Sequence, residues 1–228
     1  MDDTPLPPRS LPRPYWALAL SVLFHPLLVP TYMYILLLRI NPFLFGSNGF
    51  GDERAMLTLI MLVVYTFVIP VVSVLLMIML NMVSNVMVED RMERVGPLLL
   101  VMVLYFWIYY NLSKSNDVPT IFSAFLLGVV VALAVSFAVN TLEKISLHAV
   151  GMGGLTGMVM ITMALFGSQG LVVGGATYSL GLLVMAIVLL AGLVGTARLA
   201  LGSHTLAQVV AGYVVGFVAQ WVGLKFYF

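Results

Sequence analysis

The stretch that decides the fold is Ile145–Ala197, which reads ISLHAVGMGGLTGMVMITMALFGSQGLVVGGATYSLGLLVMAIVLLAGLVGTA. It contains no Asp, Glu, Lys or Arg. A helix needs about 20 apolar residues to cross a bilayer, so the stretch is too long for one crossing and long enough for two. The turn-forming residues of Gly167–Gly170 divide it. We therefore predict two membrane-spanning helices here, Ile145–Phe166 and about Leu171–Val194.

The rest of the 228-residue chain has the same character, because 62% of all residues are hydrophobic and only 8% are charged. So few charges cannot cover the surface of a water-soluble domain, and that class is excluded. Five further apolar runs are Tyr15–Leu38, Ala55 to about Leu80, the shorter Leu98–Leu112, about Thr120 to Val139, and Thr205 to about Phe226. We predict an all-α, polytopic integral membrane bundle with about six to seven transmembrane helices.

The same counts limit the organisation and the partners of the protein. We expect a disordered or interfacial N-terminus at residues 1–14 and a single transmembrane domain at residues 15–228. A formal net charge of +1 gives no basic field for nucleic acid. The chain has no Cys, which excludes disulfides and thiolate chemistry. We also expect no metal centre and no cofactor, because no carboxylate accompanies the three His at ligand spacing.

Prolines interrupt two of the predicted helices. His25-Pro26 and Pro30 lie within the first, and Pro70 lies within the second. Proline removes a backbone donor, so each site predicts a kink or a break. For His25 we favour a packing role at the kink, and the alternative is that a bend carries this imidazole into a functional site.

Polar residues gather in three segments at the ends of predicted helices, namely Glu89–Pro97, Glu143–His148 and Ala197–Gln208. Two crossings separate the first segment from the second, and two more separate the second from the third. An even number of crossings returns the chain to the same face of the membrane. All three segments are therefore predicted to lie on one side.

Helical spacing brings polar residues of these segments onto common faces. The pairs one turn apart are Arg91 with Arg94, Lys144 with His148, and His204 with Gln208. Positions four and eight residues after Gln208 on the same helix face are Gly212 and Gly216. These small residues form a surface that lets a neighbouring helix approach closely. Cations and imidazoles without a matching set of carboxylates favour an anion site. Guanidinium groups bind phosphate, and imidazoles can attack phosphorus or protonate a leaving oxygen.

Each feature taken alone has a structural explanation. Arg91 and Arg94 can form a solvated ladder with the neighbouring acids, and Lys144 can pair with Glu143 at the interface. His204 can cap a helix, and His148 can serve in packing. The functional interpretation depends on all of these residues occurring together at one face.

The third segment resembles the final signature of the type 2 phosphatidic acid phosphatase superfamily, in which Arg, five residues, His, three residues and Asp follow one another. Arg198 and His204 have this spacing, and Gln208 stands where the family has Asp. Ser146 and His148 match the family's Pro-Ser-Gly-His signature. The basic signature ending in proline is matched loosely, by Arg91, Arg94 and Pro97.

The resemblance implies a role for each matching residue. His204 is then the nucleophile that forms a phospho-histidine, and His148 is the acid that protonates the leaving group. The residues expected to hold phosphate are Arg91, Arg94, Lys144, Ser146 and Arg198. Gln208 can still accept a hydrogen bond from His204 and select its tautomer, but it supplies no negative charge.

Together these features predict a membrane lipid phosphatase that hydrolyses a phosphomonoester or pyrophosphate of a lipid without a metal. Its partners are then the lipid phosphate and membrane lipids, and the expected location is the inner membrane of a bacterium. The alternative is a catalytically impaired relative that binds or moves phospholipid headgroups. A transporter built around the broken first helix is a third class, disfavoured because no acidic residue lies deep within a span.

Overall fold

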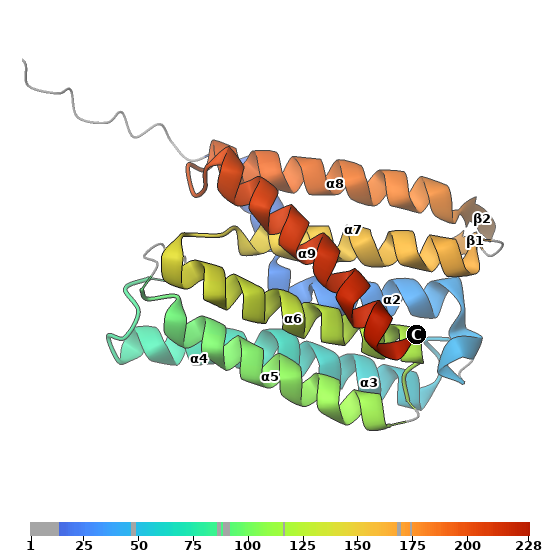
Figure 1. The fold of residues 1–228 in the computed structure, drawn as a ribbon. Coiled ribbons are helices and arrows are strands. Elements are labelled where there is room, and N and C mark those ends of the chain that lie inside the picture. Colours follow the sequence, from blue (N-terminus) through green and yellow to red (C-terminus); the bar gives the residue numbers. More distant parts are fainter. Residues whose placement is uncertain are drawn as a thin grey trace, which may run out of the picture.

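A computed structural model describes residues 14–46, 49–85, 88, 92–115, 117–167, 170–173 and 175–228. The helices lie roughly alongside one another, with a short β-hairpin at one end (Figure 1). Within these ranges, seven helical segments are long and apolar enough to cross a membrane, which confirms the all-α polytopic integral membrane bundle. Of the expected N-terminal segment 1–14, only Pro14 lies within the described residues.

The elements have these bounds: α1 Tyr15–Leu23, the 3₁₀ turn η1 Pro26–Leu28, α2 Val29–Ile40, the 3₁₀ turn η2 Pro42–Phe45, α3 Glu53–Val63, the π-helical turn η3 Val64–Val68, α4 Ile69–Met79, α5 Val95–Lys114, α6 Thr120–Leu142, α7 Leu147–Phe166, β1 Gly170–Val173, β2 Ala176–Ser179, α8 Leu180–Ala200 and α9 Leu206–Tyr227.

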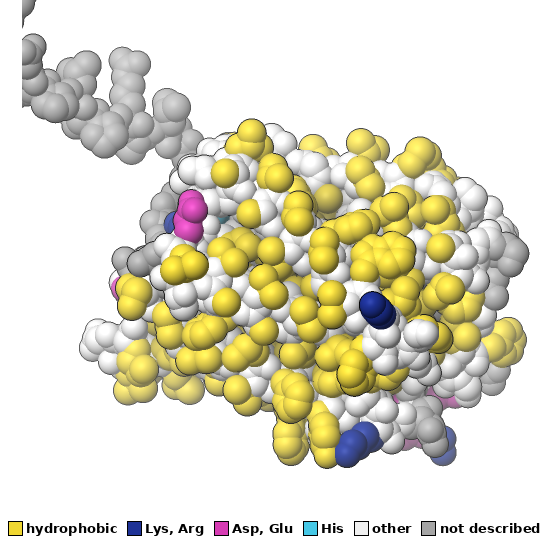
Figure 2. All heavy atoms as spheres, in the orientation of Figure 1, with side chains coloured by type: hydrophobic (Ala, Val, Ile, Leu, Met, Phe, Trp, Pro, Cys, Tyr) yellow, Lys and Arg dark blue, Asp and Glu magenta, His cyan; other side chains and the backbone are white. Residues whose placement is uncertain are grey.

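Hydrophobic side chains cover most of the face drawn in Figure 2, and few charges interrupt them. Leu189 on α8 is 70% exposed and Phe226 on α9 is 74% exposed. A soluble monomer rarely exposes so much contiguous apolar surface, whereas acyl chains solvate it without cost. The surface therefore agrees with a multi-pass integral membrane protein.

The packed interior lies where α2, α6 and α7 meet. Tyr34 of α2, Phe122 of α6 and Met152 of α7 are fully buried. The Tyr34 hydroxyl donates to the backbone oxygen of Ala55 at 3.0 Å, which ties α2 to the start of α3. An amphipathic tyrosine is suited to this position, because its ring fills the core while its hydroxyl finds a partner.

The predicted kinks are present at both proline sites. The first span is broken between Leu23 and Pro26, where His25 accepts a hydrogen bond from the backbone N–H of Leu27 and caps the 3₁₀ turn. In the second span the five residues before α4 are π-helical, and Pro70 lies in the first turn of α4. Because proline has no backbone N–H, it cannot make the regular helical hydrogen bond to the residue four positions earlier, which explains the irregular backbone at each site.

The predicted start of the sixth helix is wrong. Strands β1 and β2, at residues 170–173 and 176–179, pair as an antiparallel hairpin in which Gly170 lies opposite Ser179, and α8 begins only at Leu180. Gly175 in the connection has φ +82°, a conformation that glycine adopts readily. Short β-branched runs on either side of such a turn pair as strands.

The predicted close approach along Gly212 and Gly216 is present between α7 and α9. A Cβ on Gly216 would lie 2.0 Å from the backbone oxygen of Val150, and one on Gly212 would lie 2.7 Å from that of Ser146. From the other side, a Cβ on Gly153 would lie 2.4 Å from the backbone oxygen of Tyr213. Glycine at these positions lets the two backbones touch, as small residues do in membrane helix pairs.

Candidate active site

The described parts of the three polar segments meet at one end of the bundle, as the parity of crossings predicted (Figure 1). The helices α5, α7 and α9 begin there and α8 ends there (Figure 1). A cavity of about 220 Å³ opens between these elements and the break between α1 and η1. We call its charged part the polar end, lined by His25, Arg94, His148, Arg198 and His204. Valine, leucine, alanine, proline and glycine residues line most of the remainder.

A turn between α8 and α9 brings Arg198 and His204 together. Gly202 has φ +63°, which ends α8 in a left-handed conformation. The backbone N–H of Ser203 then bonds the carbonyl of Arg198 at 3.2 Å. Glycine at this position is the usual way to stop a helix and reverse the chain. The turn explains why five residues separate these two side chains in the sequence.

Gln208 fixes the tautomer of His204. Its Oε1 accepts from His204 Nδ1 at 3.2 Å and from the backbone N–H of Thr205 at 3.2 Å. Thr205 in return accepts from the backbone N–H of Gln208, so the two residues form a capping box at the start of α9. An amide oxygen can only accept, so Nδ1 carries the hydrogen and Nε2 keeps its lone pair. This is the tautomer that a nucleophile attacking through Nε2 requires.

The surroundings of His204 favour its neutral form. Burial lowers the pKa of His204 to about 4, and the positive charges of Arg94, Arg198 and Lys144 act in the same direction. The hydrogen bond to Gln208 opposes this shift. The imidazole lies in the turn between α8 and α9, outside the spanning helices. At neutral pH it is therefore an uncharged base surrounded by cations.

We expect the His204 ring to stay neutral until the pH falls to about 4, instead of titrating near 6.5. Removing a neighbouring positive charge makes protonation easier, so Arg94→Gln is expected to raise the midpoint. The measurement is an NMR titration of ¹⁵N-histidine-labelled protein in detergent, with the signal assigned by its loss in His204→Asn.

Arg39→Gln is the matched control for this titration. Arg39 lies in the last turn of α2, away from the cavity, with its guanidinium over the ring of Phe50. It is expected to leave the midpoint unchanged. A midpoint near 6.5 in the wild type, or equal shifts from both substitutions, would contradict this description of the site.

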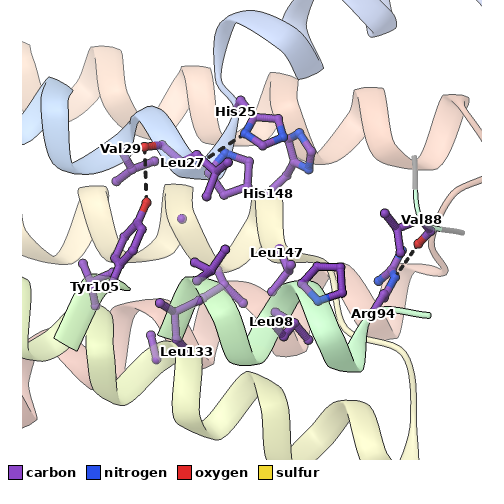
Figure 3. A pocket seen from close by; sticks show the side chains of 18 of the residues that line it. His25, Leu27, Val29, Val88, Arg94, Leu98, Tyr105, Leu133, Leu147 and His148 are labelled. Atoms are coloured by element: carbon purple, nitrogen blue, oxygen red, sulfur yellow. Dashed lines mark hydrogen bonds between the residues drawn. The ribbon is translucent and has the colours of Figure 1, made fainter. Parts of the chain in front are cut away.

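Backbone carbonyls hold Arg94 in place at the polar end. Its Nε donates to the carbonyl of Val88 at 2.8 Å (Figure 3). One terminal nitrogen donates to the carbonyl of Ile145 at 3.3 Å. Arg94 therefore joins the segment before α5 to the segment before α7. Lys144 lies near enough to His204 to lower its pKa. Arg91 lies outside the described residues.

Ser146 occupies a different place from the one that its predicted role requires. Its hydroxyl caps α7 by accepting from the backbone N–H of Ala149 at 3.4 Å, and the side chain is fully buried. It is not one of the residues that line the cavity. Its backbone N–H points to the carbonyl of Gln208 at 3.5 Å. Ser146 therefore orients the first turn of α7, which carries His148.

Ser21 is a site residue that sequence reasoning missed. Its backbone oxygen accepts from His148 Nε2 at 2.9 Å, and its hydroxyl accepts from Arg198 at 3.2 Å. One residue of α1 thus orients two predicted site residues. The single sequence signal is its position four residues before His25, which puts both on one side of a continuous helix.

His25 also lies in the site, in addition to capping the kink. Its ring centroid is 5.4 Å from that of His148, and Figure 3 shows the two rings next to each other. The turn that carries His25 packs against Gly151, where a Cβ would lie 3.4 Å from Pro26. Because Nδ1 accepts from Leu27, Nε2 of neutral His25 carries the hydrogen and is a donor. His25 therefore lies in the cavity, which is where the alternative interpretation of this residue expected it.

The charge at the polar end is positive. Among the described residues that line the cavity there is no Asp or Glu. No group of three or more His, Cys, Asp or Glu that could hold a metal ion is found in the described part of the chain. No family model, curated protein or solved structure matches this chain. The functional argument therefore depends on the geometry of the site.

Proposed function

We propose that this protein is a membrane lipid phosphatase that hydrolyses a phosphomonoester or pyrophosphate of a lipid. One observation carries the proposal: a single cavity has imidazoles and guanidiniums at one end and apolar walls beyond. This combination fits an amphiphile whose head is an anion and whose tail is hydrocarbon. We place the protein in the inner membrane of a bacterium.

The polar end is suited to a phosphoryl group. Arg94 and Arg198 line the polar end, and Lys144 is close to the imidazole of His204. Each guanidinium offers several donors in a plane that matches two phosphate oxygens. The N-termini of α5, α7 and α9 lie at the same end, where the helix dipoles favour negative charge. These groups stabilise the oxygens of a transferring phosphoryl group.

His204 is the nucleophile in this proposal. Its Nε2 attacks phosphorus in line with the departing oxygen, forming a P–N bond as the P–O bond to the lipid breaks. Gln208 holds the Nδ1 hydrogen throughout. Water then attacks the phospho-histidine, which releases inorganic phosphate and restores the imidazole.

His148 is the acid that protonates the departing lipid oxygen. Its Nε2–H donates to the carbonyl of Ser21, so the ring enters this step as the imidazolium, with a second proton on Nδ1 that passes to the departing oxygen. In the second step the same nitrogen takes a proton from the attacking water. His25, through its Nε2 hydrogen, is a further neutral donor to the phosphoryl oxygens. Ser146 contributes indirectly, by capping the helix that carries His148.

The test uses purified full-length protein in detergent with a chelator present. We expect inorganic phosphate to be released from members of a panel of lipid phosphates and lipid pyrophosphates. Soluble phosphomonoesters of the same headgroups are expected to be poor substrates, because they leave the apolar part of the cavity empty. If folded protein releases phosphate from no lipid in the panel, it is not a phosphatase.

The neutral side chain of Gln208 favours one second candidate, a protein that binds lipid phosphates without turning them over. It holds the tautomer of His204 but cannot stabilise an imidazolium. Gln208→Glu keeps the length of the side chain and the capping box while adding the missing charge. A phosphatase is expected to become about tenfold faster in this variant. Tight binding without turnover by the wild type favours the binding protein.

A further inference from the structure

A tyrosine of α5 joins the two places where membrane spans are interrupted. Tyr105 is buried and lines the cavity. Its hydroxyl donates to the backbone oxygen of Leu27 in η1 at 3.2 Å and to that of Thr66 in η3 at 3.3 Å. Figure 3 shows the Tyr105 ring reaching from α5 toward the turn that carries His25. Because a hydroxyl has one hydrogen, the two carbonyls share a single donor.

The carbonyl of Thr66 lacks its ordinary helical donor. In an α-helix that donor is the backbone N–H four residues later, and here that residue is Pro70, which has no N–H. A buried carbonyl without a donor is costly. The hydroxyl of Tyr105 therefore stands in for the donor that proline removes from the second span.

The carbonyl of Leu27 belongs to the residue that orients His25. The backbone N–H of Leu27 donates to His25 Nδ1 at 3.3 Å, while its backbone oxygen accepts from Tyr105. Leu27 is thus held through both of its backbone polar groups. If Leu27 turns away, His25 loses the donor that keeps its own hydrogen on Nε2. The hydroxyl of Tyr105 is therefore linked to the imidazole through one residue.

The ring of His25 also contacts the second interrupted span. Phe67, which follows Thr66 in η3, meets this ring edge to face at a centroid distance of 6.5 Å. The His148 ring of α7 meets it at 5.4 Å. Such contacts depend on the spacing of the backbones that carry the rings. A shared donor to Leu27 and Thr66 fixes that spacing between η1 and η3.

We propose that Tyr105 is a positioning residue for His25, holding η1 against η3 so that the imidazole keeps its Nε2 hydrogen for the polar end of the cavity. The hydrogen of Tyr105 is already shared between two carbonyls, so it is not available to a phosphoryl group. The expected effect on rate rests on the proposed function, whereas the expected effect on the imidazole does not.

The test is Tyr105→Phe, which removes the hydroxyl and keeps the ring. The full-length protein is labelled with ¹⁵N-histidine and studied by NMR in detergent at neutral pH, with the His25 signal assigned by its loss in His25→Asn. Wild-type His25 is expected to show one tautomer, with its hydrogen on Nε2. In Tyr105→Phe we expect both tautomers, because Leu27 is no longer held.

The same variants are compared for turnover of a lipid phosphate. We expect Tyr105→Phe to lower kcat about tenfold, the effect of losing one hydrogen bond to the reacting group. His25→Asn keeps a cap for Leu27 but lacks Nε2, and it is expected to lower kcat by a similar factor. Adding Tyr105→Phe to His25→Asn is expected to change kcat no further, because both act through one group. Full additivity of the two losses would overturn the proposal.

Tyr34→Phe is the matched control, because the Tyr34 hydroxyl also donates to a backbone oxygen, that of Ala55, and Tyr34 does not line the cavity. It is expected to lower Tm about as much as Tyr105→Phe and to leave the His25 tautomer and kcat unchanged. Equal changes at His25 in both variants would show a general loss of stability and overturn the proposal. An unchanged His25 signal in folded Tyr105→Phe would also overturn it.

A second replacement tests the proposal if Tyr105→Phe does not fold. The amine of p-aminophenylalanine in place of Tyr105 offers one hydrogen to each carbonyl, so the single His25 tautomer is expected to remain. Mixed tautomers in this variant, or in the wild type, would contradict the proposal. If no lipid phosphate is hydrolysed but the tautomer changes only in Tyr105→Phe, the phosphatase proposal fails and the positioning role stands.

Discussion

His204→Ala is expected to reduce phosphate release from a lipid phosphate by at least about a thousandfold, because no other group can replace an attacking nucleophile. Nε2 of His204 is the nitrogen that Gln208 leaves unprotonated, and Arg94, Arg198 and Lys144 surround it with positive charge. The expected change is in kcat. Affinity for the lipid is expected to remain within about tenfold, because the cations that hold the phosphate are still present.

Ser203→Ala is the control for this experiment. Ser203 precedes the histidine in the same turn, and it does not line the cavity. Its removal is expected to leave kcat nearly unchanged. Rapid freezing of wild-type turnover and mass spectrometry of the histidine peptide would detect the phospho-histidine directly. Substantial turnover by folded His204→Ala would eliminate this residue as the nucleophile.

Gly216→Ala is expected to destabilise the protein by about 1–3 kcal/mol, because the added methyl group would force α7 and α9 apart. The added Cβ would lie 2.0 Å from Val150 O and 2.7 Å from the backbone nitrogen of Gly154. Both contacts are with backbone, which cannot move aside as a flexible side chain can. The measurement is the apparent Tm in detergent, which we expect to fall by several degrees.

The chain provides a matched control of opposite sign at Gly192 of α8. A Cβ there would meet no described atom within 4 Å outside the backbone of its own stretch of helix. Alanine is a better helix former than glycine by about 1 kcal/mol, so Gly192→Ala is expected to keep or raise Tm. Equal Tm values for the two variants would show that the close contact between α7 and α9 does not limit stability.

Much of the fold could be predicted because charge is excluded from lipid, so the uncharged runs mark the crossings. The predicted third helix, Leu98–Leu112, extends in the structure from Val95 to Lys114, since interfacial residues continue the helix beyond the apolar run. The hairpin before α8 was missed because its valines continue an apolar stretch. Periodicity alone cannot separate such a run from a helix.

The site was predictable to the extent that it depends on chain order. Because the chain crosses an even number of times between them, Arg94, His148 and His204 were predicted to lie at one end of the bundle. The structure confirms this shared location. Their chemical roles remain predictions. The part played by Ser21 was not predicted, and the sequence placed His25 in the site only as an alternative, because both depend on how a broken first span docks against α7 and α8. That docking is a tertiary contact with no periodic signal in the sequence.

The cavity is built from both the first and the last span, which has a consequence for the biosynthesis of the protein. The cavity takes side chains from the first span and from the turn that begins the last, and the α7–α9 contact holds its two sides together. A nascent chain lacking α9 has only part of this arrangement. The complete cavity therefore forms only in the fully inserted polypeptide, and the proposed hydrolysis of lipids is expected to begin only after α9 has been inserted.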